Sequence, residues 1–350
     1  MTSDPAFPDG FERRLVDALQ PVRYSVVANA LYALMRTGVH ADLLRSPATV
    51  EDLAAGNGLD ARRLDGLLIY LRNEGYVARR SGGRFALTPA GRELEDFEPW
   101  YTLLVGGYAQ TFAQLSETLR EGAHFAGRDS AEVGRGSCGI SRYDAIPLVR
   151  ALLSDARVRP DRLIDLGCGN GDFLLALLAE FPAAAGIGVD PDAGNTTAAV
   201  QLAEAAGMSA RTDFVTATGT EYMAGFDEPD HGGDCYVASF VLQEILQQDG
   251  EEALVVMLKT LFERAPGARL AVVEVDHRPE DSAVMQHGLA NAYYNPYYLI
   301  HRVTEQRLET KEFWQDLFRR AGVRTASWRT ADPAVDSTGL AFGCLLEADR

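Results

Sequence analysis

The sequence predicts an α/β protein of two domains, a mostly helical first domain over residues 1–145 and a sheet domain over residues 146–350. A chain of 350 residues, 47% of them hydrophobic, is long enough to bury two cores. Apolar side chains recur at helical spacing in the first part, whereas short apolar runs typical of strands alternate with helical segments in the second. Such alternation indicates a parallel sheet with helices on both faces.

Composition narrows the classes of partner. The formal net charge is −17, which disfavours nucleic acid and anionic membranes because both attract basic proteins. No apolar run reaches 18 residues, and the opening "MTSDPAFPDG" lacks the basic and apolar regions of a targeting signal. The four cysteines are scattered without a CxxC pair, so neither a disulfide framework nor a zinc site is indicated. We expect a soluble cytoplasmic protein with free thiols.

The first domain begins with a helical pattern over residues 11–45. Ser46 or Thr49 can cap a short helix that ends before the turn "GNG", and a second helix follows over residues 60–73. Two short strands, "YVARR" and "RFALT", then enclose the turn "SGG". Helix, turn, helix and hairpin in this order is the pattern of a winged helix.

A winged helix can bind DNA, and Arg62, Arg63 and Arg72 lie on the helix that would enter the groove. Residues 1–145 nevertheless hold 16 arginines, no lysine and 19 acidic residues, whereas a duplex-binding module normally has a basic face. The stretch "FEPWYTLLVGGYAQTFAQLSETLREG" offers more apolar surface than a small domain can cover alone. We therefore expect no nucleic-acid partner and a homodimer that forms through the first domain.

The second domain is expected to contain five parallel strands followed by a different ending. The strand candidates are residues 162–167, 185–190, 212–219, 233–242 and 268–276, and the helix candidates are residues 146–157, 172–181, 195–207, 251–265 and 310–322. Two further strand candidates close the chain at residues 324–330 and 340–348. Ligands of such sheets bind at the carboxyl ends of the strands.

A glycine-rich turn, "LIDLGCGNGDF" at residues 163–173, follows the first strand directly. Its third glycine comes too early for the G-x-G-x-x-G of dinucleotide-binding folds, and Asp172 at the helix start would repel a phosphate. The lysine of a Walker A motif is also absent. The residues fit instead a ligand with an ammonium group for Asp165 and a ribose for Asp190, which ends the next strand.

This segment resembles motif I of class I S-adenosylmethionine-dependent methyltransferases, and residues 146–350 follow that family's order of strands and helices. The whole chain resembles the dimeric small-molecule methyltransferases that carry a winged-helix dimerisation domain in front. The resemblance implies S-adenosylmethionine as the cofactor. It further implies a role in binding it for six residues: Gly167, Gly169, Asp190, Thr218, Gly219 and Ser239. Asp165 is the candidate for the ammonium group, and Tyr143, ahead of the motif, is a candidate either for closing over the methionyl end or for packing between the domains.

The residues after the fourth strand bear on where the methyl group goes. In the O-methyltransferases that share this architecture, a histidine just after strand four takes a hydroxyl proton. Here the sequence is "VLQEI", and Gln243 occupies that position. An amide is no base, so Glu244 is the candidate for a base, a metal ligand or a substrate anchor.

The stretch "NPYYLIHRVTEQRLETKEFWQDLFRRAG" is similar to C-methyltransferases that act on 2-keto acids. In that group two histidines hold a metal that stabilises the substrate enolate, and His301 matches the second of them. Gln243 replaces the first, and glutamine oxygen is a weak ligand, so a divalent metal or iron would need His301 with Glu244 or Asp276. Without a metal, an electron-rich carbon such as indole C3 becomes the alternative acceptor.

Residues 277–305 occupy the usual position of a lid over the substrate and contain three histidines, His277, His287 and His301. Four tyrosines lie in the same segment. At helical spacing they form two pairs, and we expect Tyr294 and Tyr298 to contact the substrate.

The sequence thus predicts a C-methyltransferase for a small natural-product precursor, either a 2-keto acid or an electron-rich aromatic. Its reacting-site residues are expected to be Glu244, His301, Gln243 and Asp276. The alternatives are O- or N-methylation of a small aromatic, or a winged-helix regulator that binds S-adenosylmethionine without turning it over. Whether a metal takes part is left open.

Overall fold

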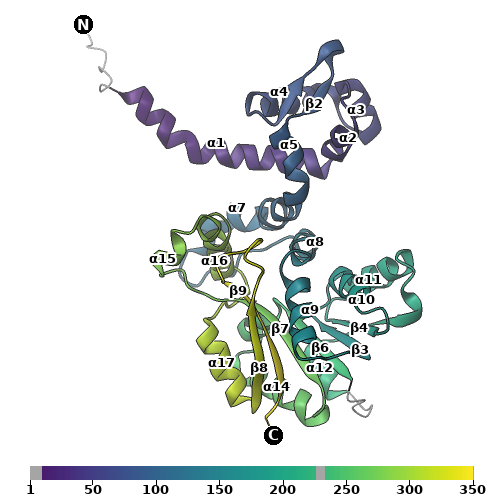
Figure 1. Ribbon diagram of the computed structural model, residues 1–350. Coiled ribbons are helices and arrows are strands. Elements are labelled where there is room, and N and C mark those ends of the chain that lie inside the picture. The colour runs from purple at the N-terminus through teal and green to yellow at the C-terminus, as the bar shows by residue number, and fades with distance from the viewer. Residues whose placement is uncertain (1–9, 226–232, 350) are drawn as a thin grey trace. The chain divides into compact units, whose positions relative to one another are not determined.

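The computed structural model describes residues 10–225 and 233–349, which form two compact units that meet in the chain between Gly107 and Tyr108 (Figure 1). Residues 108–145, which the sequence pattern attached to the first domain, therefore belong to the second unit. The first nine residues, where no targeting signal is expected, lie outside the described residues. No helix in the described part of the chain is long and apolar enough to cross a membrane.

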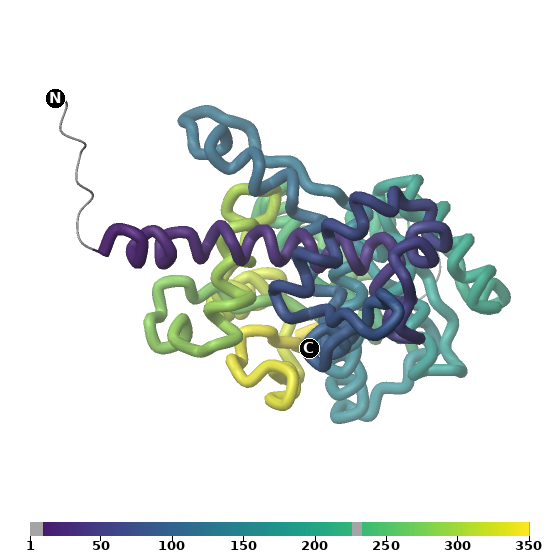
Figure 2. Tube along the Cα trace, turned by 90° about the horizontal axis from the view of Figure 1, so that it is seen from above, coloured from purple at the N-terminus to yellow at the C-terminus, as the bar shows by residue number. Residues whose placement is uncertain are grey.

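The first unit is mostly helical. Helix α1, Phe11–Arg36, runs as one continuous rod (Figure 2) and ends before Gly38, so the helical pattern predicted over residues 11–45 divides in two. Gly38 has a φ of 81°, and a Cβ there would lie 2.7 Å from Asn57 Oδ1, which explains the break. The remaining elements are α2 (Val39–Arg45), α3 (Val50–Asn57), α4 (Ala61–Asn73), β1 (Val77–Arg79), η1 (Ser81–Gly83), β2 (Phe85–Leu87), α5 (Pro89–Glu93), η2 (Leu94–Phe97), α6 (Glu98–Tyr101) and η3 (Thr102–Gly107).

Local capping explains where the short helices of this unit begin. The Thr49 side chain accepts a hydrogen bond from Asp52 N at the start of α3, and the Asp60 side chain accepts one from Arg63 N at the start of α4. The strands β1 and β2 pair antiparallel around the turn at Gly82. Their apolar residues pack with α1 to α4 into one core.

The second unit is built on a seven-stranded mixed sheet of order β5-β4-β3-β6-β7-β9-β8. Its strands are β3 (Arg162–Leu166), β4 (Ala185–Asp190), β5 (Thr212–Thr216), β6 (Asp234–Ser239), β7 (Arg269–Val275), β8 (Val323–Thr330) and β9 (Ala341–Ala348). The five predicted parallel strands are parallel. Strands β8 and β9 are antiparallel because the connection between them holds no crossover helix. The predicted α/β fold is thus confirmed.

Helices cover both faces of this sheet (Figure 1). One apolar cluster packs α9 (Ala145–Asp155) and α10 (Asp172–Glu180) on one face, and a second packs α14 (Glu251–Arg264) and α17 (Lys311–Arg320) on the other. The other elements of the unit are α7 (Ala109–Thr118), α8 (Ser130–Ser141), α11 (Ala193–Ala205), η4 (Ser209–Arg211), α12 (Gly219–Ala224), α13 (Leu242–Gln248), α15 (Ser282–Met285), η5 (Ala290–Tyr294) and α16 (Asn295–Val303). The carboxyl ends of β3, β4, β6 and β7 therefore meet at one edge, where the candidate site residues gather.

Candidate active site

The glycine-rich loop joins β3 to α10 through three left-handed glycines. Gly167, Gly169 and Gly171 have φ values of 77°, 53° and 81°. A Cβ on Gly167 would lie 2.5 Å from Val241 Cγ2, and one on Gly171 would lie 2.9 Å from Ala199 Cβ, so both are needed for packing. A Cβ on Gly169 would meet no atom of the described residues within 4 Å. Its bare backbone is therefore the part of the loop that is open to a ligand.

Asp190, the last residue of β4, holds this loop. Its Oδ2 accepts a hydrogen bond of 2.9 Å from Gly169 N, and its Oδ1 accepts bonds from Asp192 N at 2.9 Å and Asn195 Nδ2 at 3.1 Å. Three of about four acceptor positions of the carboxylate are thus occupied by the protein. One position on Oδ2 is left for a ligand hydroxyl.

Asp165 lies buried in β3 behind the loop. Its Oδ2 has no hydrogen-bond partner among the residues that the structure describes. Burial, and secondarily the charge of Asp190, raises the pKa of Asp165 to about 8. A cationic ligand would stabilise the charged form of this buried carboxylate. The ammonium group of S-adenosylmethionine is such a ligand.

The other predicted cofactor residues lie at the ends of neighbouring elements. Thr218 caps α12 through a reciprocal pair of bonds with Glu221, and the bond of 3.1 Å from Ala217 N to Asp190 O places it beside the loop; Gly219 is the next residue. Ser239 ends β6, and its buried Oγ has no partner in the described part of the chain. Tyr143 precedes α9 and is about one-third exposed, at 36%.

Gln243, at the start of α13, is the centre of a second buried cluster. Its Nε2 lies 3.3 Å from Phe240 O, 3.4 Å from the Tyr297 hydroxyl and 3.5 Å from His301 Nε2. Its backbone N donates to Glu274 Oε1 at 3.3 Å. Phe240 has a φ of 57°, a strained value for a bulky residue, and lies in the turn between the end of β6 at Ser239 and the start of α13 at Leu242.

His301, on α16, is neutral and has a defined tautomer. Its Nδ1 lies 2.7 Å from Tyr297 O, and a carbonyl can only accept, so Nδ1 carries the proton and Nε2 the lone pair. Burial, opposed by this bond, lowers the pKa of His301 to about 3. The imidazole is therefore uncharged at neutral pH and offers its lone pair towards Gln243.

Arg128 and Gln306 complete the cluster, and the sequence analysis identified neither. Arg128 Nη2 lies 2.8 Å from Glu244 Oε1, which also accepts a bond of 2.9 Å from Gln306 Nε2. Tyr108 donates from its hydroxyl to Gln306 Oε1 at 3.2 Å. Arg128 Nη1 is buried and makes no hydrogen bond of normal geometry with the described residues, although the Tyr108 hydroxyl lies close to the guanidinium. No motif marks these residues, because they come from segments far apart in the chain.

The predicted residue Asp276 is already occupied by structural contacts. Its Oδ1 accepts from Lys311 N at 2.9 Å, at the start of α17, and its Oδ2 pairs with Arg278 Nε at 2.5 Å. Glu274, two residues earlier on β7, lies closer to Gln243. Burial raises the pKa of Glu274 to about 8, and its Oε2 has no partner among the described groups.

The hydroxyl groups of the lid tyrosines have different hydrogen-bond partners. The Tyr294 hydroxyl donates to Asp336 Oδ2 at 2.5 Å, and the Tyr298 hydroxyl donates to Asp276 O at 2.6 Å, so both are engaged away from Gln243. Tyr297 instead contacts Gln243, and its ring lies against that of His301 at a tilt of 34°, with 3.8 Å between centroids. His287 bonds Ser337 Oγ at 3.0 Å, and His277 packs edge-on against Tyr298.

A metal centre is not formed by these side chains. Within residues 10–225 and 233–349, no group of three or more His, Cys, Asp or Glu side chains is arranged to hold a metal ion. Glu244 and Asp276, the predicted carboxylate ligands, are paired with Arg128 and Arg278. The Gln243 group that faces His301 Nε2 is a hydrogen-bond donor, not an oxygen ligand. The residues present therefore do not fit the metal of the resembling group.

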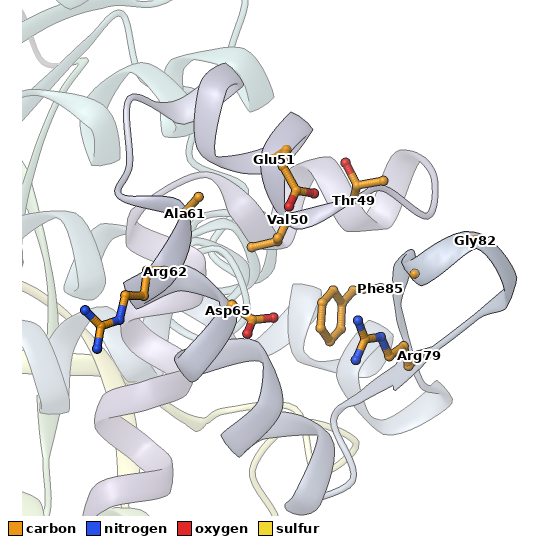
Figure 3. A pocket seen from close by; sticks show the side chains of 10 residues that line it. Thr49, Val50, Glu51, Ala61, Arg62, Asp65, Arg79, Gly82 and Phe85 are labelled. Carbon is orange, nitrogen blue, oxygen red and sulfur yellow. The ribbon is translucent and has the colours of Figure 1, made fainter.

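A groove of about 510 Å³ lies in the first unit, beside the turn between β1 and β2 (Figure 3). Its charged lining residues are Glu51, Asp65, Arg62 and Arg79, and Arg79 lies over the Phe85 ring. Two acids and two bases balance, and the lining has no histidine or cysteine. The groove therefore offers none of the chemistry that gathers at the sheet edge.

Comparison with known proteins bears on this geometry. Residues 163–264 match the family described as a methyltransferase domain. The chain is 48% identical over 341 residues to 2-ketoarginine methyltransferase of Streptomyces arginensis, covering 97% of both chains. The chain belongs to the class I S-adenosylmethionine-dependent methyltransferases. This methyltransferase is therefore an enzyme with S-adenosylmethionine as its cofactor, as predicted, and a DNA-binding regulator is not favoured.

Solved structures support the fold of the whole enzyme. The N,N-8-amino-8-demethyl-D-riboflavin dimethyltransferase of Streptomyces davawensis superposes with a TM-score of 0.64 at 19% identity, covering 97% of this chain and 99% of that chain. The mitomycin 7-O-methyltransferase superposes with a TM-score of 0.65 at 19% identity, covering 96% and 97%. At these identities the likeness concerns the fold alone.

Proposed function

We propose that this enzyme transfers the methyl group of S-adenosylmethionine to C3 of a small 2-keto acid. The observation that carries the proposal is the ion pair of Arg128 and Glu244, in which a half-buried guanidinium with one buried free nitrogen lies beside a carboxylate, directly after Gln243 in the chain. A 2-keto acid presents a carboxylate for the first and a weakly acidic C3 proton for the second. The named substrate of the relative with 48% identity is of this class.

The proposed substrate orientation follows from the free atoms of the pair. Arg128 Nη1 binds the substrate carboxylate, because its other terminal nitrogen is occupied by Glu244 Oε1. Both donors that hold Glu244 bind Oε1, so Oε2 is the oxygen that can take a proton. Glu244 is only partly buried, with 28% of its side chain exposed, which leaves that oxygen accessible.

The reaction then needs one proton transfer and one displacement. S-adenosylmethionine, when bound, supplies a methyl group on a positively charged sulfur. Glu244 Oε2 removes the proton from C3, and Arg128 stabilises the negative charge that spreads over the enolate. The C3 electron pair forms the new carbon–carbon bond while the carbon–sulfur pair stays on sulfur. Most of the remaining acceleration comes from holding C3 about 3 Å from the methyl carbon in line with sulfur.

For the cofactor, we propose that Asp165 binds the ammonium group and that the open backbone at Gly169 lies against the methionyl and ribose parts. Asp190 then contributes one acceptor to the ribose, because its other positions hold the loop. Thr218 and Gly219 border the adenine. Ser239, whose Oγ has no partner among the described residues, and Tyr143 lie at the methionyl end.

We also propose that the first unit is a winged helix through which two copies of the chain associate. Helix α1 exposes six large apolar side chains along its length, Phe11, Leu15, Val16, Leu19, Val22 and Val26. Sedimentation of Leu19→Glu against the parent enzyme tests this, with a monomer expected for the variant. A parent enzyme that sediments as a monomer would contradict it.

The substrate is tested with methyl-labelled S-adenosylmethionine and a panel of 2-keto acids, indoles and phenols, with products located by NMR. Label at C3 of a 2-keto acid supports the proposal, and label only on an indole or a phenol oxygen rejects it. Arg128→Met should raise the KM for the keto acid at least tenfold and leave cofactor affinity unchanged. Arg120→Met is a matched control, since Arg120 is exposed and pairs with the neighbouring Glu117.

A further inference from the structure

Gln243 occupies the position of the first metal-ligating histidine of the resembling group, so the direction of its side-chain amide bears on whether a metal can bind there. A side-chain amide has two ends that differ in chemistry, so its orientation decides what His301 meets. Gln243 Nε2 lies 3.3 Å from Phe240 O. If the amide were reversed, two carbonyl oxygens would face each other there, with no proton between them. The Phe240 carbonyl therefore fixes Nε2 as the end that faces His301.

His301 meets this donor with its only lone pair. Its Nδ1–H is committed to Tyr297 O at 2.7 Å, and Nε2 lies 3.5 Å from Gln243 Nε2. The lone pair that would ligate a metal is thus directed at an N–H group. The Glu244 carboxylate is paired with Arg128, whose positive charge disfavours a second cation close by.

We propose that Gln243 acts as a positioning residue in place of a metal ligand, so that methyl transfer by this enzyme does not depend on a resident metal ion. The inference rests on the proposed 2-keto acid substrate. Gln243 holds His301, Tyr297 and the strained turn at Phe240 in one arrangement. Arg128 carries the charge of the enolate, the role that a metal has in the resembling group.

The experiment compares the parent enzyme with Gln243→His and with Gln243→Asn, a matched control that keeps the amide but shortens its reach. Each protein is stripped with chelator, desalted and titrated calorimetrically with Fe²⁺ and Zn²⁺, and thermal unfolding checks that the variants fold. We expect no metal binding by the parent or by Gln243→Asn, and measurable but weak binding by Gln243→His, in which a second imidazole beside His301 acts against the repulsion by Arg128. Stripping should leave the parent's rate unchanged, and Gln243→Asn should lower kcat with little effect on cofactor affinity.

Stoichiometric metal binding by the stripped parent, or loss of its activity on stripping that added metal restores, would overturn the inference. If the proposed 2-keto acid substrate is wrong, the same experiment gives a different result. In that case no 2-keto acid accepts a methyl group before or after stripping, while the calorimetric comparison of parent and Gln243→His still decides whether Gln243 occupies a ligand position.

Discussion

The two halves of the candidate site are built in different ways. The glycine-rich loop at the centre of the cofactor half comes from residues 163–195, and the Asp190 carboxylate holds it by hydrogen bonds within that one segment. The reacting half draws Arg128 from one segment, Gln243 from a second, and His301 with Gln306 from a third. A half built from one segment is readable as a motif and suits a shared cofactor. A half built from distant segments can change its chemistry one residue at a time, as Gln243 illustrates.

The largest expected effect comes from removing the proposed base of the reacting half. Glu244→Gln should lower kcat about 10²- to 10⁴-fold, the usual contribution of a positioned general base, with cofactor affinity unchanged. Single-turnover assays, quenched at set times with a saturating 2-keto acid, measure this fall in rate. Unfolding by urea serves as the control, because the variant leaves Arg128 without its counter-charge. If the variant kept a tenth or more of the parent rate, Glu244 would not be the general base.

A substitution in the cofactor half should act on binding and not on chemistry. Gly169→Ala meets no neighbouring atom, so its cost to the folded protein is the left-handed backbone alone, roughly 1–2 kcal/mol. Its methyl group, however, occupies the face on which we place the cofactor, and the cofactor Kd should rise by more than tenfold. Isothermal titration with S-adenosylhomocysteine measures the change. Unaltered affinity would show that the ligand contacts another part of the loop.

Asp165 makes the cofactor half sensitive to pH. Because the pKa of Asp165 is raised to about 8, the carboxyl is mostly protonated at pH 6 and pH 7, and an ammonium ligand requires the charged form. The charged fraction grows about tenfold from pH 6 to pH 7, so cofactor affinity should rise by about the same factor, with proton release on binding. Titrations in two buffers of different ionisation enthalpy measure both effects.

The Asp165→Asn variant is the control for this linkage. It should bind the cofactor more weakly and with a flat response over the same pH range. Equal pH dependence in the variant and the parent would mean that another group titrates.

The smallest expected effect separates the lid tyrosines. Tyr297→Phe removes a hydrogen bond of 3.4 Å to Gln243, and a neutral bond contributes about 0.5–1.5 kcal/mol, so kcat should fall a few-fold. Tyr294→Phe removes the bond to Asp336 and should lower stability with little change in kcat. Steady-state kinetics beside thermal unfolding compares the two. If instead Tyr294→Phe lowered kcat and Tyr297→Phe lowered only stability, Tyr294 would be the residue that faces the substrate.

Most of the fold was predictable because its signals are local. Strand β4 coincides with the apolar run at residues 185–190, and Thr49 caps α3 as the sequence indicated. The errors were at element ends. The expected strand over residues 233–242 stops at Ser239, because Phe240 adopts a left-handed turn and α13 begins at Leu242. No periodicity in the sequence announces such a turn.

The candidate site likewise has residues that local sequence patterns predict and residues that they do not. Glycines at every second position after an apolar run, and an acidic residue closing the next strand, are local patterns, so the sequence alone determined the fold class and the cofactor. Arg128, Tyr297 and Gln306 carry no local signal, and only the packing of α16 and the chain around Arg128 against the sheet edge brought them to Gln243 and Glu244. The reason is physical: backbone shape depends on neighbours in the chain, whereas the charge and hydrogen-bond state of a buried side chain depends on neighbours in space.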